Sequence, residues 1–198
     1  MRPKIAPRRT AAACALIAVA LGAAVSNLPA KDEDDDDLMR FEKEHPLGEV
    51  PGDGALLYVL RPTSAAFAIK SWFFRDQEVL GVNKGSSYFF VTLSPGKHVL
   101  WSKSENVDAL ELEAETGKTY YVQQHVRMGG LKARTNIELL DDAEGAERLA
   151  KCDKHGTLTD AGLARGKELA AEHWEDAQSS LAKQAEKQAK KEAKADKP

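Results

Sequence analysis

The sequence predicts a mainly β fold, an antiparallel β-sandwich with a C-terminal helical extension, and three observations support this prediction. Between residues 52 and 140, short segments alternate apolar with polar residues, as strands with one buried face do. Gly, Pro, Asn and Asp separate these segments at the close spacing of a sandwich or barrel. After residue 141 the pattern becomes helical, and nothing alternates strand with helix as a parallel α/β sheet would.

The strands that we expect, in chain order, are 56–60, 66–75, 78–82, 87–93, 98–103, 108–114, 119–127 and 133–140. The clearest is 87–93, where Phe89, Val91 and Leu93 share one face and Tyr88 and Phe90 the other. Turn residues stand between the strands, at Asp76-Gln77, Asn83-Lys84-Gly85, Ser94-Pro95-Gly96 and Thr116-Gly117-Lys118. In the second of these turns we expect Gly85 to supply a positive φ.

Residues 1–30 have the pattern of a secretory signal peptide. Arg2, Lys4, Arg8 and Arg9 form a basic region, and an apolar run over 11–25 follows it. That run is shorter than the roughly 20 residues that span a bilayer, and small residues favour cleavage after Ser26 or, second, after Ala30. We therefore expect a periplasmic or extracellular protein, with an inner-membrane anchor formed by an uncleaved signal as the alternative.

The distribution of charged residues indicates how the chain beyond the signal is organised. Without the four basic residues of the signal, 24 basic and 31 acidic residues remain, a net charge of −7, which argues against nucleic-acid binding. Residues 31–51 begin with an acidic run and are predicted to be a flexible linker without a metal site. The β domain is expected over 52–145 and the helical, charged extension over 146–198.

The extension is predicted to hold two helices. Asp141 and Asp142 favour an N-cap for a helix that ends near Ala150, and a break follows over 152–156. Thr157 or Thr159 then caps a helix from about residue 160 to about residue 191. Its thin apolar face either docks on the β domain or pairs with a partner or a second copy, and consists of Leu163, Ala170, Trp174, Ala177 and Leu181. Cys152, the one cysteine beyond the signal, is a possible intermolecular thiol.

No pattern in the sequence indicates a catalytic, metal or cofactor site. The Gly-x-Ser-x-Gly elbow is absent, and the Cys152–His155 pair supplies two of the four ligands of a structural zinc site. The best ligand-binding candidates are Tyr121, Gln123 and His125, which share the more polar face of one predicted strand. A hydrolase built on His98, His125 and Asp108 is the enzymatic alternative.

Three segments of the β region are similar to a family of exported bacterial proteins. Residues 54–62 (GALLYVLRP) resemble its opening strand, residues 85–98 (GSSYFFVTLSPGKH) its central hairpin, and residues 114–122 (AETGKTYYV) a later strand. The family is domain of unknown function 2846, related to prealbumin-like and PEGA-like β domains, and the likeness spans about half of the chain. It implies a small β-sandwich in the cell envelope and carries no known reaction or catalytic residues.

These observations together predict a non-catalytic envelope protein. We expect a binding or accessory module whose partner is another envelope protein or polymer, with no contact to nucleic acid and with membrane contact only through an uncleaved signal. The alternatives are the periplasmic hydrolase named above and a structural protein that self-assembles through its C-terminal helix.

Overall fold

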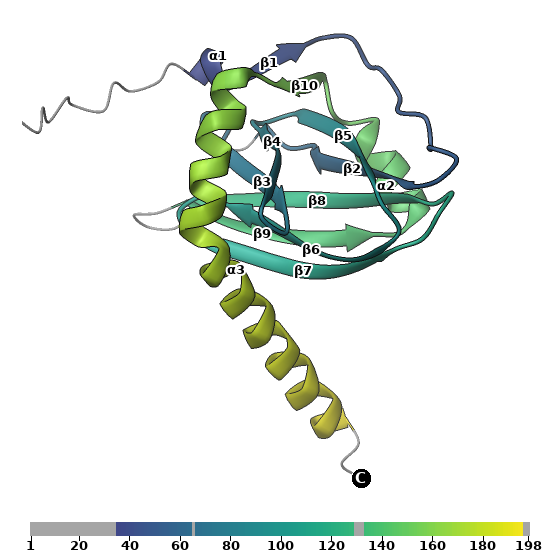
Figure 1. Ribbon diagram of the computed structural model, residues 1–198, viewed down its shortest axis with the longest axis vertical. Coiled ribbons are helices and arrows are strands. Elements are labelled where there is room, and N and C mark those ends of the chain that lie inside the picture. The colour runs from purple at the N-terminus through teal and green to yellow at the C-terminus, as the bar shows by residue number, and fades with distance from the viewer. Residues whose placement is uncertain (1–34, 65, 129–132, 196–198) are drawn as a thin grey trace, which may run out of the picture. The chain divides into compact units, whose positions relative to one another are not determined.

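The computed structural model describes residues 35–64, 66–128 and 133–195 (Figure 1), so the predicted signal over 1–30 lies outside the described residues. The protein is mainly β, with two sheets and a long C-terminal helix, as the sequence predicts. No described helix has the length and apolar character needed to cross a membrane.

The larger sheet has six strands and is mixed. Its strands, in spatial order, are β1 (Met39–Glu42), β10 (Lys154–Leu158), β5 (Ser87–Leu93), β2 (Ala55–Arg61), β8 (Thr119–Met128) and β9 (Ala133–Leu140). The pairs β2–β8 and β10–β5 are parallel, so the prediction of an antiparallel arrangement throughout is wrong for this sheet. Parallel neighbours need a crossover connection, and between β2 and β8 the chain forms all four strands of the second sheet.

The smaller sheet has four antiparallel strands in the order β4 (Glu78–Asn83), β3 (Ser71–Arg75), β6 (Gly96–Lys103) and β7 (Val107–Ala114). Tight turns lie where they were predicted, with Asp76 at a φ of 51° and Gly96 at a φ of 120°. In the turn before β5, however, Ser86 and not Gly85 has the positive φ. Gly85 serves there for close approach, since a Cβ would lie 3.0 Å from the Cα atoms of Ser64 and Phe67.

The main core lies between the two sheets, where side chains from both sheets pack together. Its fully or largely buried members come from both sheets: Ala55, Leu57, Val59, Phe73, Phe89, Leu93, Leu100, Leu112, Ala114, Val122 and Ile137. The predicted faces of β5 are confirmed, because Phe89 and Leu93 belong to this core whereas Tyr88 and Phe90 pack on the opposite side of the sheet.

Two helices cover the outer faces of the sheets. Helix α2 (Asp142–Leu149) packs over β2 and β8 and begins at the predicted N-cap, Asp141, whose carboxylate accepts from the Glu144 amide at 2.8 Å. Helix α3 (Asp160–Ala195) crosses the smaller sheet (Figure 1) and buries Leu169, Ala170 and Ala177 against it. Thr159 is its cap, with Oγ1 accepting from the Gly162 amide at 3.1 Å.

The N-terminal segment differs from the flexible linker that was predicted. Helix α1 (Asp35–Leu38) leads into β1, which pairs antiparallel with β10. Leu38 and Met39 are 3% and 2% exposed in the core beneath α3, so burial of this apolar pair outweighs the acidic residues before it. Because β1 and β10 complete the large sheet, the β domain extends beyond the predicted range of 52–145, and β10 occupies part of the predicted break.

Candidate functional site

Tyr121 lies on the outer face of the large sheet, beneath α2. Its ring is parallel to that of Tyr58 on the neighbouring strand, with an interplanar angle of 9° and 5.3 Å between centroids. Gly145 of α2 touches the ring so closely that a Cβ would lie 2.2 Å from the Tyr121 Cγ. The predicted ligand residue is therefore a half-buried wall and not an open aromatic platform.

Residues 43–50, which we call the strap, cross the same outer face without regular secondary structure. Four hydrogen-bonding contacts hold the strap. His45 Nε2 lies 3.1 Å from the Cys152 carbonyl and 3.3 Å from the Leu149 carbonyl. Tyr88 donates its hydroxyl to Pro46 O, and the Gly48 amide donates to the Tyr58 hydroxyl, each at 2.8 Å. Side chains of the sheet thus supply partners for a segment that has no strand neighbour.

A pocket of about 430 Å³ opens between the strap, the sheet and α2, and we call it the strap pocket. Its lining residues are His45, Leu47, Gly48 and Val50 of the strap, Leu56 and Tyr58 of β2, Thr119 and Tyr121 of β8, and Ala146, Leu149 and Ala150 at the helix. The volume and the mainly apolar lining with a few polar groups are typical of small-molecule sites. Leu47 and Val50 remain 68% and 41% exposed, so the strap presents apolar surface to solvent here.

Burial disfavours ionisation of two tyrosines around the strap pocket, Tyr121 and Tyr88. Burial, together with the nearby Tyr58 and Asp142, raises the pKa of Tyr121. The pKa of Tyr88, below the strap, is raised to about 12, chiefly by burial. Within the described part of the chain no hydrogen-bond partner lies within reach of the Tyr121 hydroxyl. This phenol is thus a neutral group that can donate to or accept from a ligand.

Gln123 and His125 do not line the strap pocket. Their side chains hydrogen-bond to each other, with 3.2 Å between Gln123 Nε2 and His125 Nδ1, and His125 Nε2 lies 3.0 Å from a carboxylate oxygen of Glu138 on β9. The structure therefore divides the three predicted ligand residues. Tyr121 belongs to the pocket, and the other two form a separate polar group farther along β8.

Among the described residues, no hydrogen bond joins the members of the hydrolase alternative to one another. His98 interacts with Asp76 at 3.3 Å and with the Ser94 carbonyl at 2.8 Å, so both of its ring nitrogens have partners. His125 interacts with Glu138, and the Asp108 carboxylate accepts from the Ile137 amide and from Gln184 of α3, each at 2.8 Å. Each of the three is thus engaged with a different set of neighbours.

Cys152 does not fit the intermolecular thiol that was considered. It is 2% exposed, and burial raises the pKa of its thiol to about 12, which leaves almost no thiolate near neutral pH. No group of three or more His, Cys, Asp or Glu side chains that could hold a metal ion occurs among the described residues.

The apolar face of α3 is used within the chain. Trp174 and Leu181 pack on the core formed with the small sheet, and Leu163 is 38% exposed at the first turns of the helix. Of the two alternatives for this face, docking on the β domain is therefore the one found. A partner helix would have to displace that packing.

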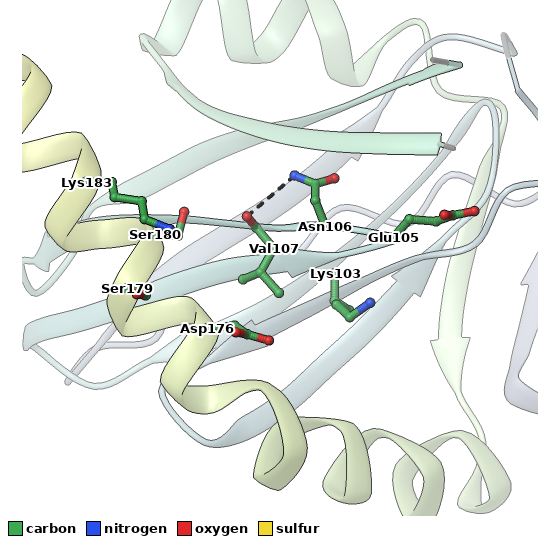
Figure 2. Close-up of a pocket in the computed structure, with 8 residues that line it drawn as sticks. All are labelled: Lys103, Glu105, Asn106, Val107, Asp176, Ser179, Ser180 and Lys183. Carbon is green, nitrogen blue, oxygen red and sulfur yellow. Dashed lines mark hydrogen bonds between the residues drawn. The ribbon is translucent and has the colours of Figure 1, made fainter. Parts of the chain in front are cut away.

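A polar pocket of about 340 Å³ lies between α3 and the β6–β7 turn (Figure 2). Its lining residues are Lys103, Glu105, Asn106, Val107, Asp176, Ser179, Ser180 and Lys183. Asn106 is already engaged, because its side chain bonds both to the backbone amide and to the carbonyl of Thr135. Ammonium groups and carboxylates occur in equal number, so this pocket selects neither anions nor cations.

Comparisons with known proteins add one relative. An uncharacterized protein of Haemophilus influenzae is 28% identical over 97 residues, which are 48% of this chain and 57% of the relative. The alignment therefore spans little more than half of that protein. No protein-family model matches the chain, and no solved structure matches it.

The strap residues and Tyr58 were not predicted from the sequence to be parts of the site. His45, Leu47 and Val50 belong to the segment that was predicted to be a linker, and Tyr58 was assigned only to an alternating strand. The available signal was the set of apolar residues placed singly between Pro46 and Pro51.

Proposed function

We propose that the protein is an exported, non-catalytic binding module of the cell envelope, with the strap pocket as its binding site. Its two sheets are, in this proposal, a β-sandwich of the prealbumin-like or immunoglobulin-like kind. The observation that carries the proposal is the pocket itself: four segments of the chain enclose an apolar space of about 430 Å³. It includes the Tyr121 phenol, which makes no hydrogen bond to any other described residue. The resemblance to domain of unknown function 2846 is consistent with it.

Export rests on the basic and apolar pattern of residues 1–30. Fractionation of cells that produce the full chain, with N-terminal sequencing of the product, tests it. We expect a periplasmic protein that begins after Ser26 or Ala30. Recovery in the membrane fraction with Met1 retained would favour the inner-membrane anchor, and recovery in the cytoplasm would contradict export.

Binding is tested with N-phenyl-1-naphthylamine, an uncharged probe whose fluorescence rises in apolar sites. We expect saturable binding that is lost in Ala146→Trp, because Ala146 is an exposed residue of the pocket lining and an indole there fills the space. Ala143→Trp, one turn earlier and also exposed, is the matched control, because Ala143 does not line the pocket.

Equal loss in both variants, or no binding by the unchanged protein, would contradict the proposed site. Turnover of a hydrolase substrate panel that disappears on changing His98 or His125 would contradict the non-catalytic assignment.

A further inference from the structure

The strap pocket has no charged lining, and acidic groups outnumber basic ones close to it. None of its lining residues is an Asp, Glu, Lys or Arg. Glu49 stands in the strap between the lining residues Gly48 and Val50 and is exposed. Asp142 precedes Ala146 by four residues and therefore shares its face of α2.

Two lysines near the strap pocket do not neutralise the charge of Glu49 and Asp142, because each of these lysines has an acidic group of its own close by. Lys151 is engaged with Glu147, with 2.5 Å between Nζ and Oε1. Lys118 lines an adjoining hollow of about 500 Å³, where Glu115 and Asp142 oppose it. The two hollows adjoin at Thr119, which lines both of them. Taken together, the strap (43–50) and residues 141–151 hold six carboxylates and three basic groups, Lys43, Arg148 and Lys151. This excess of negative charge favours a cation at the mouth of the pocket and disfavours an anion.

Tyr121 connects the apolar space with this negative charge. Tyr121 is the ladder partner of Leu140, two residues before Asp142, so Asp142 is a near neighbour of Tyr121 in the fold. Its charge also contributes to the raised pKa of the Tyr121 phenol. The phenol remains protonated at neutral pH and keeps lone pairs that can accept from an ammonium group. A ligand with an apolar body and a positively charged head group would therefore find an apolar cavity for the body and, next to it, the Tyr121 hydroxyl and a carboxylate for the head group.

We propose that the strap pocket binds an organic amine, with the apolar body inside the pocket and the ammonium group at the Tyr121 hydroxyl on the side of Asp142. This inference rests on the proposed function, because it names the class of ligand for the same pocket. Binding needs no covalent step and no cofactor.

A matched series of probes tests the charge preference: 4-phenylbutylamine, 4-phenylbutan-1-ol and 5-phenylpentanoate, which share the same 4-phenylbutyl body. Titration calorimetry on the mature protein at pH 7 is expected to give the tightest binding for the amine and the weakest for the carboxylate. Asp142→Asn should weaken amine binding by about two- to five-fold, as expected for one partly exposed charge pair, and leave the alcohol unchanged. Raising the salt concentration should reduce the advantage of the amine.

Glu144→Gln is the control variant. Glu144 is also in the first turn of α2 and exposed, so its loss affects the helix N-terminus similarly, but it does not line the pocket. It should leave all three affinities unchanged.

The outcomes separate this inference from the proposed function. If all three probes bind equally, or the carboxylate binds best, and Ala146→Trp abolishes binding, the amine preference is wrong while the pocket remains a binding site. If no probe binds, or Ala146→Trp changes nothing, both the amine preference and the proposed site are overturned.

Discussion

Asp108 of β7 accepts a hydrogen bond from the backbone amide of Ile137 in β9, with 2.8 Å between Oδ2 and N. The two strands belong to different sheets, and Asn106 repeats the arrangement by accepting from the Thr135 amide at 2.7 Å and donating to the Thr135 carbonyl at 2.9 Å. Side chains of one sheet thus take the place of a missing strand neighbour. An edge strand occupied in this way is protected from pairing with other chains.

Asp108→Ala is therefore expected to destabilise the protein. The carboxylate accepts from Ile137, from the Asn136 side chain and from Gln184 of α3, so its loss frees donors on two elements. We expect a loss of about 1.5–3 kcal/mol in the free energy of unfolding, measured by urea denaturation. Glu111→Ala on the same strand is the control, because its exposed pair with Lys97 is worth at most about 1 kcal/mol. Equal effects of the two substitutions would show that the contact between the sheets contributes little.

Gly145→Ala should destabilise the protein although Ala is the better helix former. Inside an exposed helix this change gains up to about 1 kcal/mol. Here the added Cβ would lie 2.2 Å from the Tyr121 Cγ, so α2 or the ring must move. We expect a lower midpoint of thermal unfolding and weaker binding of N-phenyl-1-naphthylamine. In the background of Tyr121→Gly, which also removes the Cβ that would lie 2.6 Å from the added methyl group, the same Gly145→Ala change should no longer be destabilising, and failure of this rescue would place the clash elsewhere.

The C-terminal helix should be dispensable only beyond its last contact with the β domain. Truncation after Asp153 removes β10 and all of α3, which uncovers core residues that include Trp72, Phe74 and Trp101. Truncation after Ala185 keeps the bond between Gln184 and Asp108 and everything before it. Circular dichroism and size-exclusion chromatography should show an aggregated or unfolded short form and a folded longer form. A folded, monomeric short form would contradict the packing role of α3.

The sequence predicted most strands because their determinants are local. In β8, Val122, Gln124 and Val126 were expected on one face, and all three are buried. The polar member of this face is accommodated by a buried network, since Gln124 donates to the hydroxyls of Ser71 and Ser102 and accepts from Asn83. Alternation therefore placed the residue correctly but gave no indication of its partners.

Features that depend on distant residues were not predictable in the same way. Strands β1 and β10 are separated by more than a hundred residues, and each is a short piece of a charged or polar segment. The same holds for the strap pocket, which forms because His45 meets the carbonyls after α2 and Gly48 meets Tyr58. Tyr121 was identified because the alternation of residues within its own strand placed it on the more polar face. The strap residues opposite Tyr121 were not identified, because no comparable pattern marks them.

His155 should make the protein less stable in mild acid. Its ring packs against Tyr88 and Phe90, and burial, aided by His45 and opposed by Glu42, lowers its pKa below the ordinary value near 6.5. Between pH 6.5 and the lower pKa of the folded state, His155 is protonated in the unfolded chain but still neutral in the folded chain. Protonation therefore favours the unfolded state, and the stability present above pH 6.5 is lost as the pH falls toward the pKa of the folded state. Urea denaturation at pH 7.5 and pH 5.5 should show a smaller loss of stability in His155→Gln than in the unchanged protein. An equal loss of stability in His155→Gln and in the unchanged protein would contradict the assignment to His155.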